Sequence, residues 1–340
     1  MRIRVKGFKS IEEASLDLSR VNVVIGPPES GKSNLLEALS MFTFLGQLKN
    51  YEDAGIVSRY SVEEGLWRFS NLQNILRIIT RINRITDLFF RFTEKTAEIE
   101  LGGNKIELSY DSKNRKVEIS LKGEKVLYID NMTVESKLED FESLSRILDK
   151  VMFYRYSEEK QIEWGNFLLP PHGLNLLHLL KVNQRFGSTA AKILEDLGLK
   201  LSLNLETDEI EFWKFENGRG LRIGYNLLSD TVKRILFSFG ALETNENSII
   251  VMEEPEVHSF PFYTKLLAER IALNKNSFVV TTHNPYFLET IIDKVPKYEL
   301  SVYLARARGM RSEYTAVDIS RIKEIIAERA DVFLELGETI

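Results

Sequence analysis

The chain has 340 residues, of which 44% are hydrophobic and 28% are charged, a balance typical of a soluble globular protein with a large core. Lysine and arginine number 45 against 50 aspartate and glutamate, so a globally basic nucleic-acid binder is excluded, although a local basic face is not. The lack of cysteine excludes disulfides and thiolate metal sites, and the four histidines do not have the paired spacing of a structural zinc site.

Apolar runs in the sequence are short. None approaches the roughly 18 residues of a membrane-spanning helix, which excludes an integral membrane protein. The first residues, MRIRVKGFKSIEE, lack the apolar segment of a secretory signal, so we expect a cytoplasmic protein. Few glutamines and abundant lysine, glutamate and isoleucine are typical of thermophile proteins, although compositional bias alone gives the same pattern.

The N-terminal segment predicts two strands that lead into a loop and a helix. The strands are expected at Arg2–Val5 and Val21–Ile25, joined by an alternating stretch that ends at Leu18. The second strand, VNVVI, is continuously apolar, as in a strand that is buried on both faces. It runs directly into GPPESGKS and then into NLLEALSMFTFL, which has the pattern of an amphipathic helix.

The middle of the chain changes from a helical to an alternating pattern. Residues 51–91 predict helices, and residues 88–130 alternate apolar and polar side chains between short turn signals. This alternation predicts an antiparallel meander. Residues 134–150 again predict a helix, and a strand is expected near Val151–Tyr156.

The C-terminal part returns to alternating strands and helices. SIIVM and SFVVTTH predict buried strands separated by helical pattern, which indicates parallel neighbours. After His283 we expect a helix, a hairpin formed by SVYLARARG and SEYTAVDIS, and a helix from Arg321. The chain is thus predicted to form one composite domain over residues 1–340, with an N-terminal core at 1–50, an inserted helical and antiparallel β arm at 51–165 and a C-terminal core at 166–340.

A phosphate-binding motif spans Gly26–Ser33, which matches G-x-x-x-x-G-K-[ST] between a predicted strand and a predicted helix. Backbone N–H groups of such a loop, and the N-terminus of the helix behind it, offer fixed positive dipoles to phosphate. Lys32 can reach the β- and γ-phosphates, and the Ser33 hydroxyl can bind Mg²⁺. The predicted nucleotide-binding residues are Gly26, Pro27, Pro28, Glu29, Ser30, Gly31, Lys32, Ser33 and Asn34.

Two acids end the predicted strand in SIIVMEEPE. Glu253 is placed to hold the magnesium shell, with Ser33, and Glu254 is placed to orient or deprotonate the attacking water. A buried strand that runs into a solvated acidic turn would give the same pattern. The intact phosphate loop favours the ATPase interpretation, with ATP and Mg²⁺ as the ligands.

His283 follows the next buried strand, SFVVTT. A histidine at the carboxyl end of a parallel strand lies on the ligand edge of the sheet, where it can donate to the γ-phosphate. The alternative is a strand-end histidine bonded to a neighbouring loop. Lys32, Glu254 and His283 are therefore the predicted catalytic residues.

Together these motifs resemble the ATP-binding-cassette class of P-loop ATPases, and within it the RecF/SMC/OLD-like group of AAA-type ATPases. The opening VKGFKSIEEASLDLSRVNVVIGPPESGKSNLLEAL, the segment GLNL, EEPEVHSFP and TTHNPYFLE carry the resemblance in that order. It implies an α/β P-loop NTPase of the ABC-ATPase-like head type, with a mostly parallel core sheet, an antiparallel β subdomain and a helical subdomain. We see no heptad stretch for coiled-coil arms and no room for a C-terminal TOPRIM nuclease, so we expect a lone ATPase head.

The resemblance also implies residues that act between two subunits. LSDTVKR at 228–234 occupies the position of the signature loop, whose serine caps the γ-phosphate of ATP bound to a second copy. Ser229 is then a nucleotide-binding residue in trans, and an ATP-dependent homodimer is expected. Thr231 stands where glycine is usual, which predicts crowding at the phosphate and slow hydrolysis.

Two further nucleotide-binding residues, Lys9 and Gln73, are suggested by the resemblance. Lys9 belongs to the Phe8-Lys9-Ser10 segment of the opening. Gln73 is the best candidate for the glutamine of the Q-loop, and a plain surface glutamine fits it equally well.

Four arginines, Arg77, Arg81, Arg84 and Arg91, would share one face if a single helix persisted through them. Such a strip would suit DNA phosphates, although a solvated face that pairs with the acidic surplus is the interpretation we favour.

Two functions stay open from the sequence. The first is a Mg-dependent ATP-hydrolysing switch of the DNA-repair or phage-defence type, which dimerises around ATP. The second is a nucleotide-dependent regulatory or partner-binding module with little turnover. A partner protein encoded nearby and DNA are candidate partners of either, and no membrane partner is expected.

Overall fold

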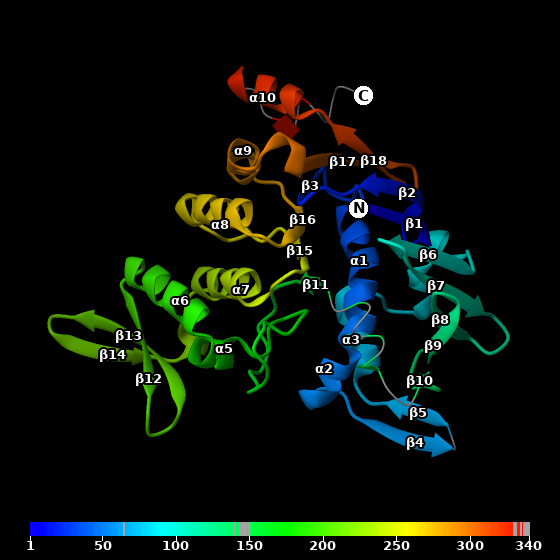
Figure 1. The fold of residues 1–340 in the computed structure, drawn as a ribbon, viewed down its shortest axis with the longest axis horizontal. Helices are drawn as coiled ribbons and strands as arrows, with labels where there is room; N and C mark the ends of the chain where they lie inside the picture. Colours follow the sequence, from blue (N-terminus) through cyan, green and yellow to red (C-terminus); the bar gives the residue numbers. More distant parts are fainter. Residues whose placement is uncertain are drawn as a thin grey trace.

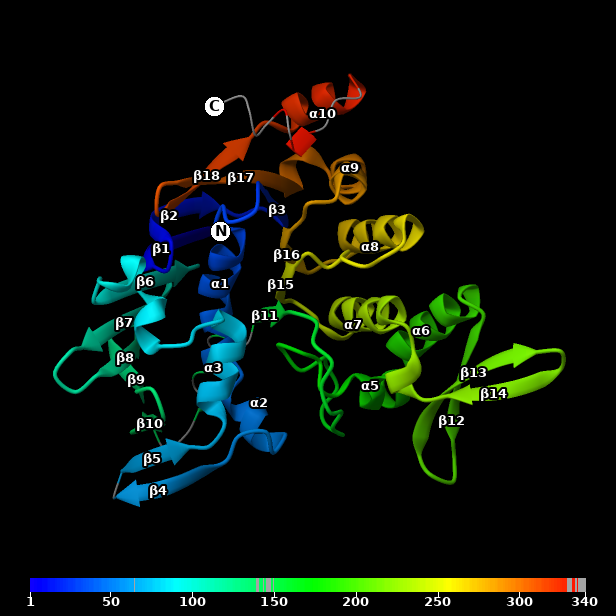
Figure 2. The same cartoon turned by 180° about the vertical axis from the view of Figure 1, so that it is seen from behind.

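The protein is built in layers around one central helix, α1 (Lys32–Gly46) (Figure 1). In the computed structural model a core sheet lies on one side of α1 and an antiparallel sheet lies on the other, and Figure 2 shows the same order from behind. Further helices cover the face of the core sheet that points away from α1. The structure describes residues 1–63, 65–138, 141–142, 144, 148, 150–328, 332–333 and 335.

The core sheet contains the six strands β3 (Val21–Ile25), β11 (Val151–Tyr154), β15 (Ile249–Glu253), β16 (Ser277–Thr281), β17 (Leu300–Arg308) and β18 (Arg311–Val317). Their order is β11-β15-β16-β3-β17-β18, and neighbours are parallel except in the β17–β18 hairpin at one edge. The predicted α/β fold with a mostly parallel core sheet is confirmed.

The antiparallel sheet contains the nine strands β1 (Arg2–Phe8), β2 (Ile11–Asp17), β4 (Arg59–Glu63), β5 (Leu66–Phe69), β6 (Thr96–Leu101), β7 (Asn104–Asp111), β8 (Lys116–Leu121), β9 (Glu124–Ile129) and β10 (Val134–Ser136). Their order is β2-β1-β6-β7-β8-β9-β10-β5-β4. The strands β6 to β9 form the predicted meander, and β6 also pairs with β1. The inserted arm therefore continues the sheet that the N-terminal hairpin begins.

The remaining elements are helices and a small third sheet. The other α-helices are α2 (Leu48–Asp53), α3 (Leu72–Thr80), α5 (Leu176–Val182), α6 (Gln184–Asp196), α7 (Asp230–Thr244), α8 (Pro261–Leu273), α9 (Pro285–Lys294) and α10 (Ile319–Ala327). The short 3₁₀ helices are η1 (Ile85–Leu88), η2 (Phe90–Phe92), η3 (Tyr225–Leu227) and η4 (Lys297–Glu299). The third sheet is antiparallel and contains β12 (Leu199–Asn204), β13 (Glu209–Glu216) and β14 (Arg219–Ile223).

The third sheet projects from the side of the molecule next to α5 and α6 (Figure 1). The sequence pattern did not predict it. Among the residues that the structure describes, no helix is both long enough and apolar enough to cross a membrane.

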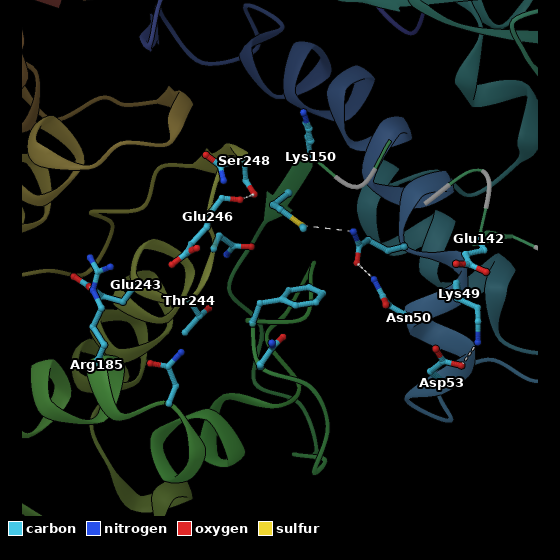
Figure 3. Close-up of a pocket in the computed structure, with 17 residues that line it drawn as sticks. Lys49, Asn50, Asp53, Glu142, Lys150, Arg185, Glu243, Thr244, Glu246 and Ser248 are labelled. Atoms are coloured by element: carbon cyan, nitrogen blue, oxygen red, sulfur yellow. Dashed lines mark hydrogen bonds and ion pairs between the residues drawn. The ribbon is translucent and has the colours of Figure 1, made fainter. Parts of the chain in front are cut away.

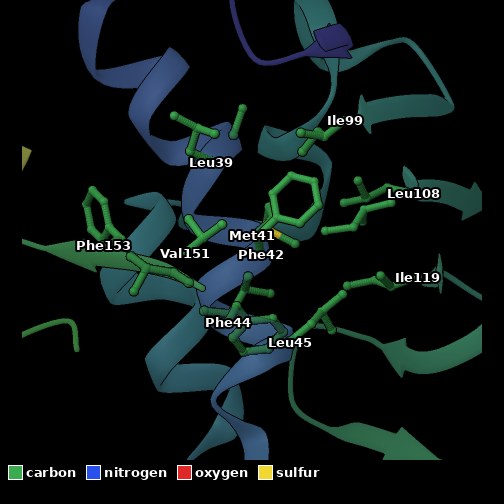
Figure 4. Packing of buried hydrophobic residues seen from close by; sticks show 14 of the residues in the cluster. Leu39, Met41, Phe42, Phe44, Leu45, Ile99, Leu108, Ile119, Val151 and Phe153 are labelled. Carbon is green, nitrogen blue, oxygen red and sulfur yellow. The ribbon is translucent and has the colours of Figure 1, made fainter. Parts of the chain in front are cut away.

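Burial on nearly every side distinguishes α1, because 13 of its 15 residues are buried. In Figure 4 the ring of Phe42 points toward Ile99 and Leu108 of the antiparallel sheet, while Val151 and Phe153 of β11 lie on the other side of the helix. A helix that is apolar all round belongs in a core rather than at a surface. The expected amphipathic helix is therefore a central one, and its N-terminus is fixed from two sides.

Two helical predictions in the inserted arm are wrong in part. Residues 51–91 include the hairpin β4–β5 as well as helices, because β5 pairs with β10 and tertiary pairing overrides local pattern there. The helix α3 is confined to nine residues between Asn71 and Arg81, both of which have left-handed backbone angles. Within residues 134–150 the structure has the strand β10, and much of the rest lies outside the described residues.

We expect Phe42→Ala to lower the free energy of unfolding by about 3–5 kcal/mol, because it removes a buried ring between two sheets. The urea midpoint of the variant measures the loss. Phe262→Ala is the matched control, since that ring is 57% exposed and its removal should leave the midpoint nearly unchanged. Equal midpoints for the two variants would contradict the central role of α1.

Candidate nucleotide site

The predicted site residues come from three neighbouring strands of the core sheet. The phosphate loop follows β3, the acidic pair ends β15, and His283 follows β16, which lies between them. These strands are parallel, so their carboxyl ends meet at one edge of the sheet. The structure therefore brings together residues that lie more than 200 positions apart, as for Ser33 and Glu253.

The phosphate loop is shaped by two glycines with left-handed φ angles, 144° at Gly26 and 94° at Gly31. A Cβ atom at Gly26 would lie 2.2 Å from the carbonyl oxygen of Ala305, and one at Gly31 would lie 1.9 Å from the Ser312 hydroxyl. Glycine is thus required because the β17–β18 hairpin packs directly against the loop. Among the described residues no side chain caps the N-terminus of α1, which leaves its N–H groups available to an anion.

Lys32 lies across the loop, with its ammonium donating to the carbonyls of Gly26 at 2.9 Å and Pro27 at 2.8 Å. Burial lowers the pKa of Lys32, and the nearby Glu254 and Glu253 carboxylates oppose that effect. Pro27, Pro28 and Glu29 are exposed along the loop, whereas Ser30 is buried. The lysine faces a hollow of about 450 Å³ that is lined by Pro28, Glu29, Lys32, Ser33, Glu253, Glu254 and His283, together with Arg81, Arg155 and Arg234.

The two predicted magnesium ligands are in direct contact, because the Ser33 hydroxyl donates to Glu253 Oε1. The other carboxylate oxygen of Glu253 accepts from Arg155 Nε at 2.7 Å. Although burial raises the pKa of Glu253, the charges of Arg155 and Arg81 and the bond from Ser33 outweigh burial and lower that pKa. An ionised carboxylate beside a hydroxyl, next to the phosphate loop, fits the hard oxygen ligands that Mg²⁺ prefers.

Glu254 and His283 form a pair at the rim of the same hollow, with His283 Nε2 3.2 Å from Glu254 Oε1. Glu254 has a left-handed φ of 43°, and its N–H group is held by the backbone oxygen and the hydroxyl of Thr281. Strained backbone of this kind is common where a side chain must point at a ligand. Burial and the charge of Lys32 lower the pKa of His283, which keeps its ring neutral near pH 7.

A second hollow of about 430 Å³ adjoins the phosphate loop and shares Glu29 and Arg81 with the first. It contains the predicted residues Lys9 and Asn34. Lys9 bonds to the buried Glu37 carboxylate and to the carbonyl of Thr80, and the Asn34 amide donates to the Ser10 hydroxyl at 2.5 Å. Two hollows thus adjoin the phosphate loop.

Gln73 is not brought to the site. Its amide donates to the backbone oxygen of Asp130 at 2.8 Å, and it lines neither hollow. The strand β11 lies next to β15, and Arg155 and Tyr156, which follow it, both line the hollow. Sequence reasoning missed Arg155, although the end of a strand beside the acidic pair was a usable signal.

The four arginines of the predicted strip do not share a helix face, because α3 ends at Thr80. Arg77 donates to the backbone oxygen of Asn131 at 3.0 Å, and Arg81 turns inward to contact Glu37 and Glu253. Arg84 precedes η1, and the guanidinium of Arg91 lies over the Phe90 ring. The condition for a shared face, a single helix through all four arginines, is therefore not met.

The signature-like segment begins α7. Ser229 is exposed and is the N-cap of the helix, where its hydroxyl accepts from the Val232 N–H at 3.3 Å. The hydroxyl of Thr231 donates to the carbonyl of His258 at 2.8 Å. Thr231 is therefore turned toward the segment that follows the acidic pair, and it ties that segment to α7.

A sequence model of the family described as "AAA domain, putative AbiEii toxin, Type IV TA system" matches residues 21–289. That range includes the phosphate loop, Ser229, the acidic pair and His283. The chain belongs to this AAA-domain family. A search among curated proteins gave no match.

Solved structures of SMC heads share the fold of this AAA domain. The Smc head domain with a coiled coil and joint from Pyrococcus yayanosii has a TM-score of 0.57 at 11% identity and covers 96% of this chain and 99% of its own. A SmcHead bound to the C-winged helix domain of ScpA has a TM-score of 0.56 at 14% identity, with 95% and 99% covered. The Smc head domain with an extended coiled coil bound to the C-terminal domain of ScpA, from Pyrococcus furiosus, has a TM-score of 0.53 at 14% identity, with 96% and 98% covered.

Family and fold together confirm the resemblance to P-loop ATPases of the SMC/RecF-like group.

A larger cleft of about 950 Å³ lies away from these motifs, at the opposite edge of the core sheet. Figure 3 shows its lining, which includes Asn50 and Asp53 on one side and Glu243 and Thr244 on the other. It contains none of the predicted site residues. Volume alone would therefore favour a different place from the one that the motifs of this AAA domain predict.

Glu256 is a buried acid of the AAA domain that the sequence reasoning missed. It is 3% exposed, one carboxylate oxygen accepts from the Thr282 hydroxyl, and the other has no partner among the described residues. Burial raises the pKa of Glu256 to about 7. In EEPE nothing distinguishes this third acid from an exposed acid in a turn, so no signal in the sequence indicated that Glu256 is buried.

We expect the pKa of Glu256 to make stability depend on pH. The folded chain holds this proton more tightly than the unfolded chain, so the free energy of unfolding should fall as pH rises from about 4.5 to about 7. Glu256→Gln removes that dependence and should be more stable than the parent at pH 8 by up to about 3 kcal/mol, with little difference at pH 5. Urea midpoints at both pH values measure it.

The matched control for this pH effect is Glu206→Gln, at an exposed position. It should follow the parent at both pH values. If Glu256→Gln also follows the parent, the carboxyl of Glu256 does not keep its proton in the folded chain.

Proposed function

We propose that the chain binds Mg-ATP and hydrolyses it to ADP and phosphate. The observation that carries this proposal is the convergence of Lys32, Ser33 and the Glu253–Glu254 pair with His283 on one hollow. A cation, a hydroxyl, a magnesium-binding carboxylate and a paired acid are the groups that phosphoryl transfer to water needs. The fold and the family match agree with this chemistry.

The reaction follows from the arrangement of the residues. As a water oxygen bonds to the γ-phosphorus, the bond to the β–γ bridging oxygen breaks and ADP leaves. The carboxylate of Glu254, held beside the neutral ring of His283, is positioned to take the proton of that water. Lys32 would stabilise charge on the phosphate oxygens, and a bound Mg²⁺ held by Ser33 and Glu253 would neutralise the β- and γ-phosphates.

We also propose a homodimer that forms around ATP. Ser229 is exposed at the N-terminus of a 15-residue helix, so its hydroxyl and that helix end can meet a nucleotide held by a second copy. Exposed apolar side chains near Ser229 support such a contact. One is close to Ser229 in the sequence, and two follow His258, which is hydrogen-bonded to Thr231. They are Leu227 at 74%, Phe260 at 69% and Phe262 at 57% exposure.

One observation favours the alternative, a nucleotide-dependent regulatory module with little turnover. Asp230 places a carboxylate in the first turn of α7, beside Ser229. Among the described residues its only ion pair is with Arg234, whose Nε lies 2.7 Å from Asp230 Oδ2. A negative charge at this position would repel the γ-phosphate of a partner. Slow hydrolysis is therefore part of the proposal.

The place of this activity in DNA repair or phage defence is proposed on the resemblance alone. DNA, a partner protein encoded nearby and a cytoplasmic location stay predictions.

We expect Glu254→Gln to bind ATP like the parent but to hydrolyse it roughly 100-fold more slowly, because the amide cannot accept a proton. Release of phosphate from labelled ATP measures turnover, and equilibrium binding of a fluorescent ATP measures affinity. Lys32→Ala is the control for the site itself and should lose binding. Normal turnover in Glu254→Gln would show that Glu254 does not take part in the reaction. If Glu253→Gln binds ATP without hydrolysing it instead, then Glu253 is the base and Glu254 the magnesium ligand.

We expect the Glu254→Gln protein to sediment as a dimer with Mg-ATP and as a monomer without it, since the nucleotide bridges the two copies. Ser229→Ala in the same background tests the contact and should weaken the dimer. Phe215→Ala is a matched control, because that exposed ring lies on β13, in the projecting third sheet. A monomer in both conditions, with turnover independent of protein concentration, would exclude the dimer.

A further inference from the structure

Four charged side chains form a cluster that includes the candidate magnesium ligand Glu253. Arg155 Nε is 2.7 Å from Glu253 Oε2, and Arg155 Nη2 is 3.4 Å from Glu37 Oε1. Arg81 Nε is 2.5 Å from Glu37 Oε1, and Arg81 Nη2 is 3.4 Å from Glu253 Oε1. Each guanidinium thus bridges the same two carboxylates, and the charges alternate around the cluster.

The two carboxylates differ in their freedom to change partners. Glu37 lies on α1, has no exposed side-chain surface and also binds Lys9, so it is fixed in the core. Glu253 is 15% exposed and lines the hollow with Lys32 and Ser33. Glu37 therefore anchors the arginines, whereas Glu253 is the partner that can be exchanged.

In the proposed function, two sets of partners compete for the carboxylate of Glu253. With Ser33 it is the proposed magnesium ligand, yet in this structure its oxygens already accept bonds from Ser33 and Arg155 and lie near Arg81. A carboxylate engaged by a metal ion can no longer satisfy these donors fully, and a partly buried guanidinium without an anion is costly. The γ-phosphate is the new anion that would enter the hollow, and its oxygens match a guanidinium in geometry.

We propose that Arg155, supported by Arg81, binds the γ-phosphate of ATP in cis and is held by Glu253 when that phosphate is absent. This inference rests on the proposed function. It assigns to Arg155 the discrimination between ATP and ADP, because only ATP offers the anion that replaces Glu253.

The same exchange would reach α3. Arg155 Nη1 donates to the carbonyl of Ile78 at 3.0 Å, and Lys9 donates to the carbonyl of Thr80. Arg81 itself is the C-cap residue of that helix. The last turn of α3 is therefore held by cations that also lie near the phosphate site. If Arg155 moves to the γ-phosphate, its bond to α3 in the inserted arm changes as well.

The test compares ATP and ADP affinity in the Glu254→Gln background, so that ATP is not consumed. Arg155→Gln should weaken Mg-ATP binding by at least about tenfold and change Mg-ADP binding by no more than about twofold, since only a bond to the γ-phosphate is lost. Arg155→Lys should recover part of the loss, because the ammonium keeps the charge without the fork. Arg77→Gln is the matched control on α3 and should leave both affinities unchanged.

Several outcomes would overturn this assignment. Equal weakening of ATP and ADP binding would make Arg155 a structural tie only, and unchanged ATP affinity would remove it from the phosphate. Arg81→Gln, at a half-exposed position, provides the same comparison if Arg155→Gln does not fold. Failure of the Glu254→Gln protein itself to bind ATP would instead refute the proposed function.

Discussion

The burial of α1 between two sheets is the constraint on which the rest of the structure depends. With 13 of its 15 residues buried, this helix packs against the antiparallel sheet on one side and the core sheet on the other. This packing fixes the position of its N-terminus relative to β3, and residues 26–31 of the phosphate loop connect the two in the chain. Close packing of this kind transmits any displacement of the helix to both sheets.

The candidate site lies at the carboxyl edge of the core sheet, next to this fixed helix. The strands β3, β16 and β15 are parallel neighbours, so each delivers its polar residues at the same level. Glu254 and the two glycines of the phosphate loop all have left-handed φ angles and all lie at that edge. At Glu254 this unfavourable backbone directs a side chain to the hollow, and regular strands lie behind it.

Charge inside the molecule is organised around the same edge. Glu37 has no exposed side-chain surface, and an unpaired carboxylate there would be strongly unfavourable, so Lys9, Arg81 and Arg155 are drawn to it. These cations come from the N-terminal hairpin, from the end of α3 and from the end of β11. The ion pairs thus join the layers at the place where phosphate would add further negative charge.

The sequence by itself determined the chemistry that is local. Gly26–Ser33, the Glu253–Glu254 pair and His283 could be recognised because a loop motif or a strand end is written in a few consecutive residues. Only the tertiary structure decided the rest. Arg155 lies 98 positions from Glu253 and 118 from Glu37, and α3 ends at Thr80 where the periodic pattern suggested a longer helix. The hairpin β4–β5 and the role of Arg81 likewise depend on partners distant in sequence, since pairing between strands and between buried charges is set by packing and not by local pattern.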